Sequence, residues 1–212
     1  MADASRDTSA ERPSPVERVG WSGLKALVEE GERASLLRFL EGQSRILEMI
    51  ARSDPLTAVL EELTKVLEQQ VDGMACSVLL LSADRKHLQH VAAPSLPERY
   101  TRAIDGSVIG PRAGSCGTAA FLGRPVIVTD IEKDPLWVDY KDLALSCGLK
   151  ACWSTPILSR RGDVLGTFGM YHRQPFAPSS LHLGLIDLAT NLARLAIERD
   201  AADRDRERLW DA

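Results

Sequence analysis

The residues best placed to do chemistry surround one cysteine, Cys116, in the run Gly114-Ser115-Cys116-Gly117. Two glycines at this spacing allow a tight turn onto the start of a short helix. Free N–H groups and the dipole at a helix start favour an anion or a carbonyl oxygen, and they lower the pKa of a thiol there. Cys116 is therefore the candidate reactive thiol, with Ser115 and Gly117 as candidate ligand-binding neighbours. The alternative is that the glycines only permit the turn.

One predicted strand, residues 151–158, adds Cys152 and Ser154 as candidates. Side chains alternate between the faces of a strand, so these two share one face while Trp153 points to the other. A small polar pair leaves room for a ligand. We therefore expect Cys152 and Ser154 at a pocket and Trp153 against flanking helices. The competing interpretation makes Cys152, like Cys76, a small core residue in apolar strand sequence.

The spacing of cysteines and histidines does not indicate a metal site. The four cysteines contain no C-x-x-C pair and have no histidine at metal-ligand spacing. His87 and His90 are three residues apart on a predicted strand, so they point to opposite faces. His172 and His182 are predicted on opposite sides of a turn; either would suit a single axial haem ligand, but nothing selects that role. The sequence predicts no metal ligands and leaves any cofactor unknown.

Composition and charge argue against several classes of partner. The chain has 212 residues and a net charge of -4, which gives no electrostatic footprint for nucleic acid or an anionic membrane. Residues 1–16 contain acidic side chains and no apolar core, so they do not form a secretory signal. No run approaches the roughly 18 apolar residues of a membrane span. We expect a soluble, cytoplasmic protein that binds neither nucleic acid nor membrane.

Four segments are predicted along the chain. Residues 1–18, rich in Ser, Asp, Arg and Pro, are expected to be disordered. A globular domain is expected over residues 54–199, and a charged helical extension over residues 200–212. Between the tail and the domain, residues 19–53 are expected to form an amphipathic helix with a stripe spaced by four and three: Leu36, Leu40, Gln43, Leu47 and Ile50.

Within the domain, short strands alternate with helices. A helix is predicted after Asp54-Pro55, with Asp54 as its N-cap. Strands are expected over residues 76–81, 87–93, 124–130, 149–159 and 163–172, the last two joined as a hairpin. A long helix from Ser179 carries an apolar stripe of Leu181, Leu185, Leu188, Leu192 and Leu195.

The segment from about residue 54 to residue 199 resembles a GAF domain, the small-molecule-binding sensor module of bacterial histidine kinases, cyclic-dinucleotide enzymes and phytochromes. The resemblance implies an α+β fold with a central antiparallel sheet of five or six strands, flanked by helices, and with amphipathic N- and C-terminal helices. It rests on motifs in the right order: Ala92-Ala93-Pro94-Ser95-Leu96-Pro97, Gly114-Ser115-Cys116-Gly117-Thr118-Ala119-Ala120, Asp130-Ile131 with Asp134-Pro135-Leu136-Trp137, Cys152-Trp153-Ser154-Thr155-Pro156-Ile157, and Gly166-Thr167-Phe168-Gly169-Met170-Tyr171.

In this family the segment after Asp134-Pro135 covers the pocket, so the resemblance implies that Trp137 and Tyr140 form one wall of it. The alternative is that these two aromatics only hold the loop to the sheet. Two family ligands are disfavoured. The chain lacks the Asn-Lys…Phe-Asp-Glu signature of cyclic-nucleotide-binding relatives, and none of its cysteines is followed by the histidine that bilin-binding relatives use.

The function implied is a non-catalytic small-molecule sensor in bacterial signal transduction, for example in a two-component system, with a signalling partner protein. Such domains commonly form homodimers through flanking helices, here residues 32–52 and 179–199. Two alternatives remain open. One is a GAF-fold free methionine-(R)-sulfoxide reductase, in which Cys116 matches one position, but Leu145-Ser146-Cys147-Gly148-Leu149 replaces the family's His-Ile-Ala-Cys-Asp type segment. The other is a dimerisation scaffold whose vestigial pocket is filled by its own side chains.

Overall fold

The computed structural model describes residues 37–210, which are built around one six-stranded sheet. The order across the sheet is β3-β2-β1-β6-β5-β4, and each neighbouring pair is antiparallel. The strands are β1 (Met74–Leu81), β2 (His87–Ala92), β3 (Ser107–Val108), β4 (Val126–Val128), β5 (Ala151–Leu158) and β6 (Val164–His172).

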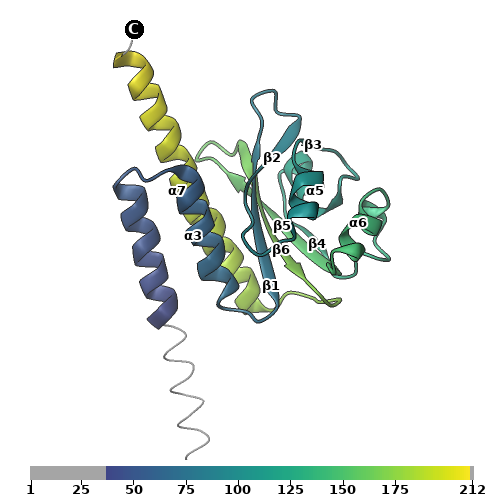
Figure 1. The fold of residues 1–212 in the computed structure, drawn as a ribbon. Coiled ribbons are helices and arrows are strands. Elements are labelled where there is room, and N and C mark those ends of the chain that lie inside the picture. The colour runs from purple at the N-terminus through teal and green to yellow at the C-terminus, as the bar shows by residue number, and fades with distance from the viewer. Residues whose placement is uncertain (1–36, 211–212) are drawn as a thin grey trace, which may run out of the picture. The chain divides into compact units, whose positions relative to one another are not determined.

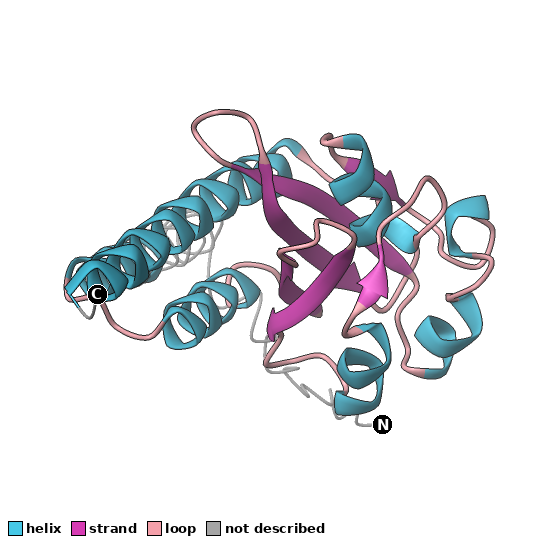
Figure 2. Cartoon of the chain, turned by 90° about the horizontal axis from the view of Figure 1, so that it is seen from above, coloured by secondary structure: helices cyan, strands magenta, loops and turns pink. Residues whose placement is uncertain are grey.

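Helices cover both faces of the sheet, which is why its central strands are apolar on both sides (Figures 1 and 2). One face carries α3 (Leu56–Glu68) and α7 (Ser180–Trp210). The other face carries α4 (Glu98–Ile104), α5 (Gly114–Leu122), the 3-10 turn η1 (Pro135–Trp137) and α6 (Lys141–Ser146). Two separate hydrophobic clusters result, one on each face of the sheet.

Residues 39–51 form a helical segment that packs against α3. A Cβ atom at Gly42 would lie 2.7 Å from Cγ1 of Val66, so glycine allows the two helices to approach closely here. Ile46 is fully buried at this contact, whereas Leu40 and Leu47 on the outer side are 49% and 42% exposed. The amphipathic pattern therefore has one buried face and one exposed leucine face.

Asp54 is not the N-cap of α3, so that prediction was wrong. Pro55, with φ -52° and ψ 132°, is the extended residue before the helix, and the helix begins one residue later than expected. The carboxylate of Asp54 instead accepts a hydrogen bond from the Arg52 guanidinium at 2.9 Å. The prediction of a long C-terminal helix holds, and the charged residues after Ile197 continue it to Trp210.

Trp153 holds the start of α7 against the sheet. Its Nε1 donates to the carbonyl oxygen of Phe176 at 3.1 Å, and its ring centroid lies 4.5 Å from that of His172. His182, in the first turns of α7, lies 5.2 Å from the Trp153 ring and 6.1 Å from His172. The two histidines that the sequence placed on opposite sides of a turn therefore share one aromatic cluster.

This cluster predicts a pH-dependent stability. Burial, with a contribution from His182, lowers the pKa of His172 from 6.5 to about 4. Because the unfolded chain takes up the proton first, the stability contributed by neutral His172 is complete above pH 6.5 and is lost as the pH falls towards 4. Urea unfolding at about pH 7.5 and about pH 5 is expected to show a fall in stability that His172→Phe reduces. An equal fall in stability for the wild-type protein and the variant would show that His172 is not the cause.

The predicted sheet of five or six antiparallel strands is confirmed, with six strands. Two details differ: residues 107–108 add a short edge strand, and β4 covers only Val126–Val128. The disordered tail expected over residues 1–18, and the predicted helix over residues 19–36, lie outside the described residues. Among residues 37–210, the helices lack the combination of length and apolar character needed to cross a membrane.

Candidate ligand site beneath helix α5

A row of small residues crosses the three central strands on the face that α5 covers. Ser77 of β1 and Ser154 of β5 both lie opposite Gly169 of β6 in the antiparallel register. A Cβ atom at Gly169 would lie 3.0 Å from Oγ of Ser77 and 3.1 Å from Sγ of Cys116. The missing side chain therefore leaves a depression in the sheet that receives the Cys116 thiol.

Cys116 reaches this depression from the first turn of α5. Gly114, at φ 60°, begins the helix in the left-handed region that favours glycine. The Cys116 sulfur lies 3.5 Å from the hydroxyl of Tyr171, the residue opposite Cys152 on the neighbouring strand. The tight turn predicted at Gly114 thus places the Cys116 thiol over a polar part of the sheet.

The surroundings of Cys116 favour its thiolate. The neighbouring Cys152 thiol, against the effect of burial, lowers the pKa of Cys116 to about 6. The hydroxyls of Ser154, Tyr171 and Thr167 act in the same direction. Burial raises the pKa of Cys152 well above its usual range. Of the two thiols, Cys116 is therefore the one that ionises.

The cover of the site is tied to the sheet through one hydroxyl. Nε1 of Trp137 donates to Oγ of Ser115 at 3.1 Å, and Oγ of Ser115 donates to the carbonyl oxygen of Cys152 at 2.9 Å. The Trp137 ring also lies against Gly114, where a Cβ atom would be 3.7 Å from it. These contacts join η1, α5 and β5.

The free space at the site is small. A cavity of about 30 Å³ remains, room for about one water molecule. The aromatic side chains of Tyr100, Tyr171 and Trp137, all nearly fully buried, occupy the rest of the region. A ligand with several non-hydrogen atoms would therefore require the cover to move outward.

Five of the seven predicted site residues line this cavity: Ser115, Cys116, Gly117, Trp137 and Tyr140. Cys152 and Ser154 lie beside Cys116 on the sheet and do not line the cavity. Trp153 faces the opposite cluster, as its alternation with Cys152 predicts. Gly117 has a packing role, since a Cβ atom there would lie 2.6 Å from the Cβ of Ala113.

Sequence reasoning missed Tyr100 and Tyr171. Their rings meet edge-on with centroids 5.7 Å apart, one from α4 and one from β6. Tyr171 ends one of the motifs on which the family resemblance rests, and the alternation of β6 could have placed it on the face of Gly169. No three His, Cys, Asp or Glu side chains within residues 37–210 come together to hold a metal ion.

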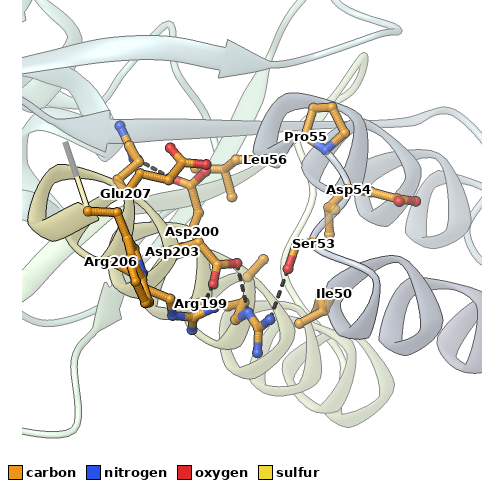
Figure 3. A pocket seen from close by; sticks show the side chains of 14 residues that line it. Ile50, Ser53, Asp54, Pro55, Leu56, Arg199, Asp200, Asp203, Arg206 and Glu207 are labelled. Atoms are coloured by element: carbon orange, nitrogen blue, oxygen red, sulfur yellow. Dashed lines mark hydrogen bonds and ion pairs between the residues drawn. The ribbon is translucent and has the colours of Figure 1, made fainter.

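A larger open hollow of about 350 Å³ lies between the turn after residue 51 and the C-terminal half of α7 (Figure 3). Several of its side chains pair with one another: Arg199 donates to Asp203 at 2.8 Å and to Ser53 at 2.9 Å, and Arg204 pairs with Asp200. Most of the charges in this hollow are therefore already compensated by neighbouring side chains.

A family model described as GAF domain matches residues 53–198. The chain belongs to the GAF domain family. This GAF domain is 38% identical over 182 residues to the methyl sulfide methyltransferase-associated sensor of Methanosarcina acetivorans. That match covers 85% of the present chain and 18% of the relative, so the chain spans less than a fifth of the curated protein it matches.

Two solved structures show the same fold at low sequence identity. The GAF domain from an Acinetobacter phosphoenolpyruvate-protein phosphotransferase is 18% identical with a TM-score of 0.58, covering 78% of this chain and 97% of that one. Free methionine-R-sulfoxide reductase from Neisseria meningitidis, in complex with its substrate, is 16% identical with a TM-score of 0.60, covering 78% and 91%. The fold is thus shared by a GAF domain of a phosphotransferase and by a reductase.

Proposed function

We propose that this GAF domain is a non-catalytic sensor that binds a small molecule beneath α5 and acts in signal transduction through a partner protein. The observation that carries the proposal is the chain of hydrogen bonds from Trp137 through Ser115 to Cys152. Cys152 faces the site, and its neighbour Trp153 packs against α7 on the other face. A ligand that moved the cover would thus perturb the strand that holds α7. The sensor relative supports the same role.

The first test is native mass spectrometry of the protein purified from its own host, compared with the denatured chain. A noncovalent small molecule that is lost on denaturation is the expected result. An empty protein that stays empty after incubation with a host metabolite extract would contradict the proposal and favour a scaffold with a filled pocket. A chromophore in the bound mass would be visible in the absorption spectrum.

Trp137→Phe is expected to reduce retention of the bound molecule about tenfold or more while lowering the free energy of unfolding by only about 1–2 kcal/mol. The change keeps a buried ring but removes the Nε1 donor to Ser115. Trp210→Phe is the matched control, because Trp210 is 82% exposed. Equal retention by both variants would remove Trp137 from the site.

We further propose a homodimer through the exposed leucine face of the helical segment over residues 39–51, together with the start of α7. Leu40 and Leu47 are exposed there, as are Leu181 and Leu183 on α7. Large exposed apolar side chains at helical spacing mark a surface that a partner covers. The double variant Leu40→Glu/Leu47→Glu is expected to sediment as a monomer at micromolar concentration, whereas Val108→Glu, at an exposed position on β3, should remain a dimer.

One observation favours a second candidate, a free methionine sulfoxide reductase: the low-pKa thiol of Cys116 with a second thiol beside it. The segment 145–149 argues against it, because it replaces the family's His-Ile-Ala-Cys-Asp type segment. Methionine sulfoxide would also need the cover to move outward, as would any ligand with several non-hydrogen atoms. Consumption of free methionine-(R)-sulfoxide by the purified protein with dithiothreitol would establish it. Assignment of the activity to this site would also require that Cys116→Ser abolish it.

A further inference from the structure

We infer that Cys116 and Cys152 form a dithiol pair that hydrogen peroxide oxidises to a disulfide. The inference goes beyond the sensor proposal and does not depend on it, since it uses only the two thiols and their surroundings. It concerns a covalent modification of the domain itself, not a molecule retained by it.

The two cysteines are neighbours that come from different elements. Cys116 is in the first turn of α5, and Cys152 is on β5 beside it. Ser115, next to Cys116 in the chain, donates to the carbonyl oxygen of Cys152 at 2.9 Å. The Cys116 sulfur lies 3.5 Å from the hydroxyl of Tyr171, the residue directly opposite Cys152 on β6, and each thiol shifts the pKa of the other. A disulfide requires such proximity because its two sulfurs are about 2 Å apart. Cys116 and Cys152 are therefore neighbours across the contact between α5 and β5, as a disulfide between them requires.

The polar groups around Cys116 have no other evident use. The hydroxyls of Ser154 and Thr167 are buried, and within residues 37–210 neither has a hydrogen-bond partner. Both stabilise the Cys116 thiolate. Buried hydroxyls are costly to leave without partners, so a sulfur that carries negative charge accounts for their presence. Gly169 provides the space in which this sulfur sits.

Access to the pair is restricted by size. Cys116 is 8% exposed and lines the cavity of about 30 Å³, whereas Cys152 is fully buried behind it. Hydrogen peroxide, with only two non-hydrogen atoms, is close in size to that cavity, whereas a bulky aromatic disulfide reagent is far larger. The geometry thus assigns Cys116 as the attacking sulfur and Cys152 as the resolving one.

The reaction balances with peroxide as the only oxidant. The Cys116 thiolate attacks one peroxide oxygen; an S–O bond forms, the O–O bond breaks, and the departing hydroxide takes a proton to become water. The Cys152 sulfur then attacks Cys116, an S–S bond forms, the S–O bond breaks, and the thiol proton of Cys152 leaves with the second hydroxide as water. Two thiols are oxidised by two electrons, and one peroxide is reduced to two water molecules.

The test treats the reduced full chain with a small excess of hydrogen peroxide, then alkylates it under denaturing conditions and maps the peptides. The expected result is loss of two of the four free thiols and one disulfide-linked peptide pair containing Cys116 and Cys152. A bulky aromatic disulfide reagent, added to the folded protein, should modify the partly exposed Cys147 and spare this pair. Oxidation confined to Cys147, or a link between other cysteines, would overturn the inference.

Single variants separate the roles of the two sulfurs. Cys116→Ser should slow peroxide consumption at least about tenfold, and Cys152→Ser should stop at a sulfenic acid on Cys116 that dimedone traps. Cys76→Ser, on the opposite face of the sheet, is the control and should form the same disulfide. If a variant does not fold, the peptide map of the wild-type chain still shows whether the disulfide between Cys116 and Cys152 forms. A disulfide in a protein that retains no ligand would support this inference and contradict the sensor proposal. A retained ligand in a protein that forms no disulfide would support the sensor proposal and contradict this inference.

Discussion

Gly166→Ala is expected to lower the free energy of unfolding by about 3 kcal/mol or more, or to prevent folding. Gly166 lies on β6 opposite Leu80 of β1, and a Cβ atom there would be 2.2 Å from the carbonyl oxygen of Leu79. Because that neighbour is backbone of a central strand, it cannot turn away as a side chain could. Urea unfolding followed by circular dichroism measures the effect.

The matched control for this substitution is Gly184→Ala on α7. A Cβ atom at Gly184 meets nothing within 4 Å, and the residue lies in a regular helix. Alanine has the higher helix propensity, so this change is expected to stabilise the protein by about 0.5–1 kcal/mol. If the two substitutions change the free energy of unfolding similarly, the backbone of β1 near Leu79 must be able to move away from a Cβ atom at residue 166.

The second large effect is expected from Trp153→Ala, at about 3–5 kcal/mol of lost stability. The side chain is 1% exposed, stacks on Phe176 at 5.6 Å, and donates a hydrogen bond to its carbonyl oxygen. Removing the indole leaves a cavity between the sheet and α7 and a carbonyl without its partner. The midpoint of chemical denaturation should shift accordingly.

Trp210→Ala is the control for Trp153, since Trp210 is exposed at the end of α7 and should change stability by less than about 0.5 kcal/mol. If Trp153→Ala loses no more stability than the control, the aromatic cluster around residue 153 must repack to fill the space. In that case His172 and His182 would also titrate at a pH nearer their ordinary value, which provides a second readout.

Local patterns predicted the elements of this fold better than they predicted its site. The alternation of small polar and large residues along β5 correctly separates Cys152 from Trp153, because strand periodicity is a local property. The pairing of Ser77, Gly169 and Ser154 across three strands depends on register, which no short segment carries. The filling of the pocket by Tyr100 and Tyr171 is long-range for the same reason. The cap of α3 was misjudged by one residue because Pro55 is extended.

The long helix α7 divides into two halves of unequal stability. As far as Ile197 it is fixed by buried contacts, whereas most residues beyond Asp200 are exposed and rely on ion pairs such as that of Arg199 with Asp203. Such pairs contribute only about 0.3–0.5 kcal/mol each and weaken with salt, so the distal turns lie close to their helix–coil balance. Amide hydrogens should exchange slowly up to Ile197 and rapidly after it. A molecule that binds residues 200–210 would be detected as slowed exchange in that half alone, because binding there selects the helical state.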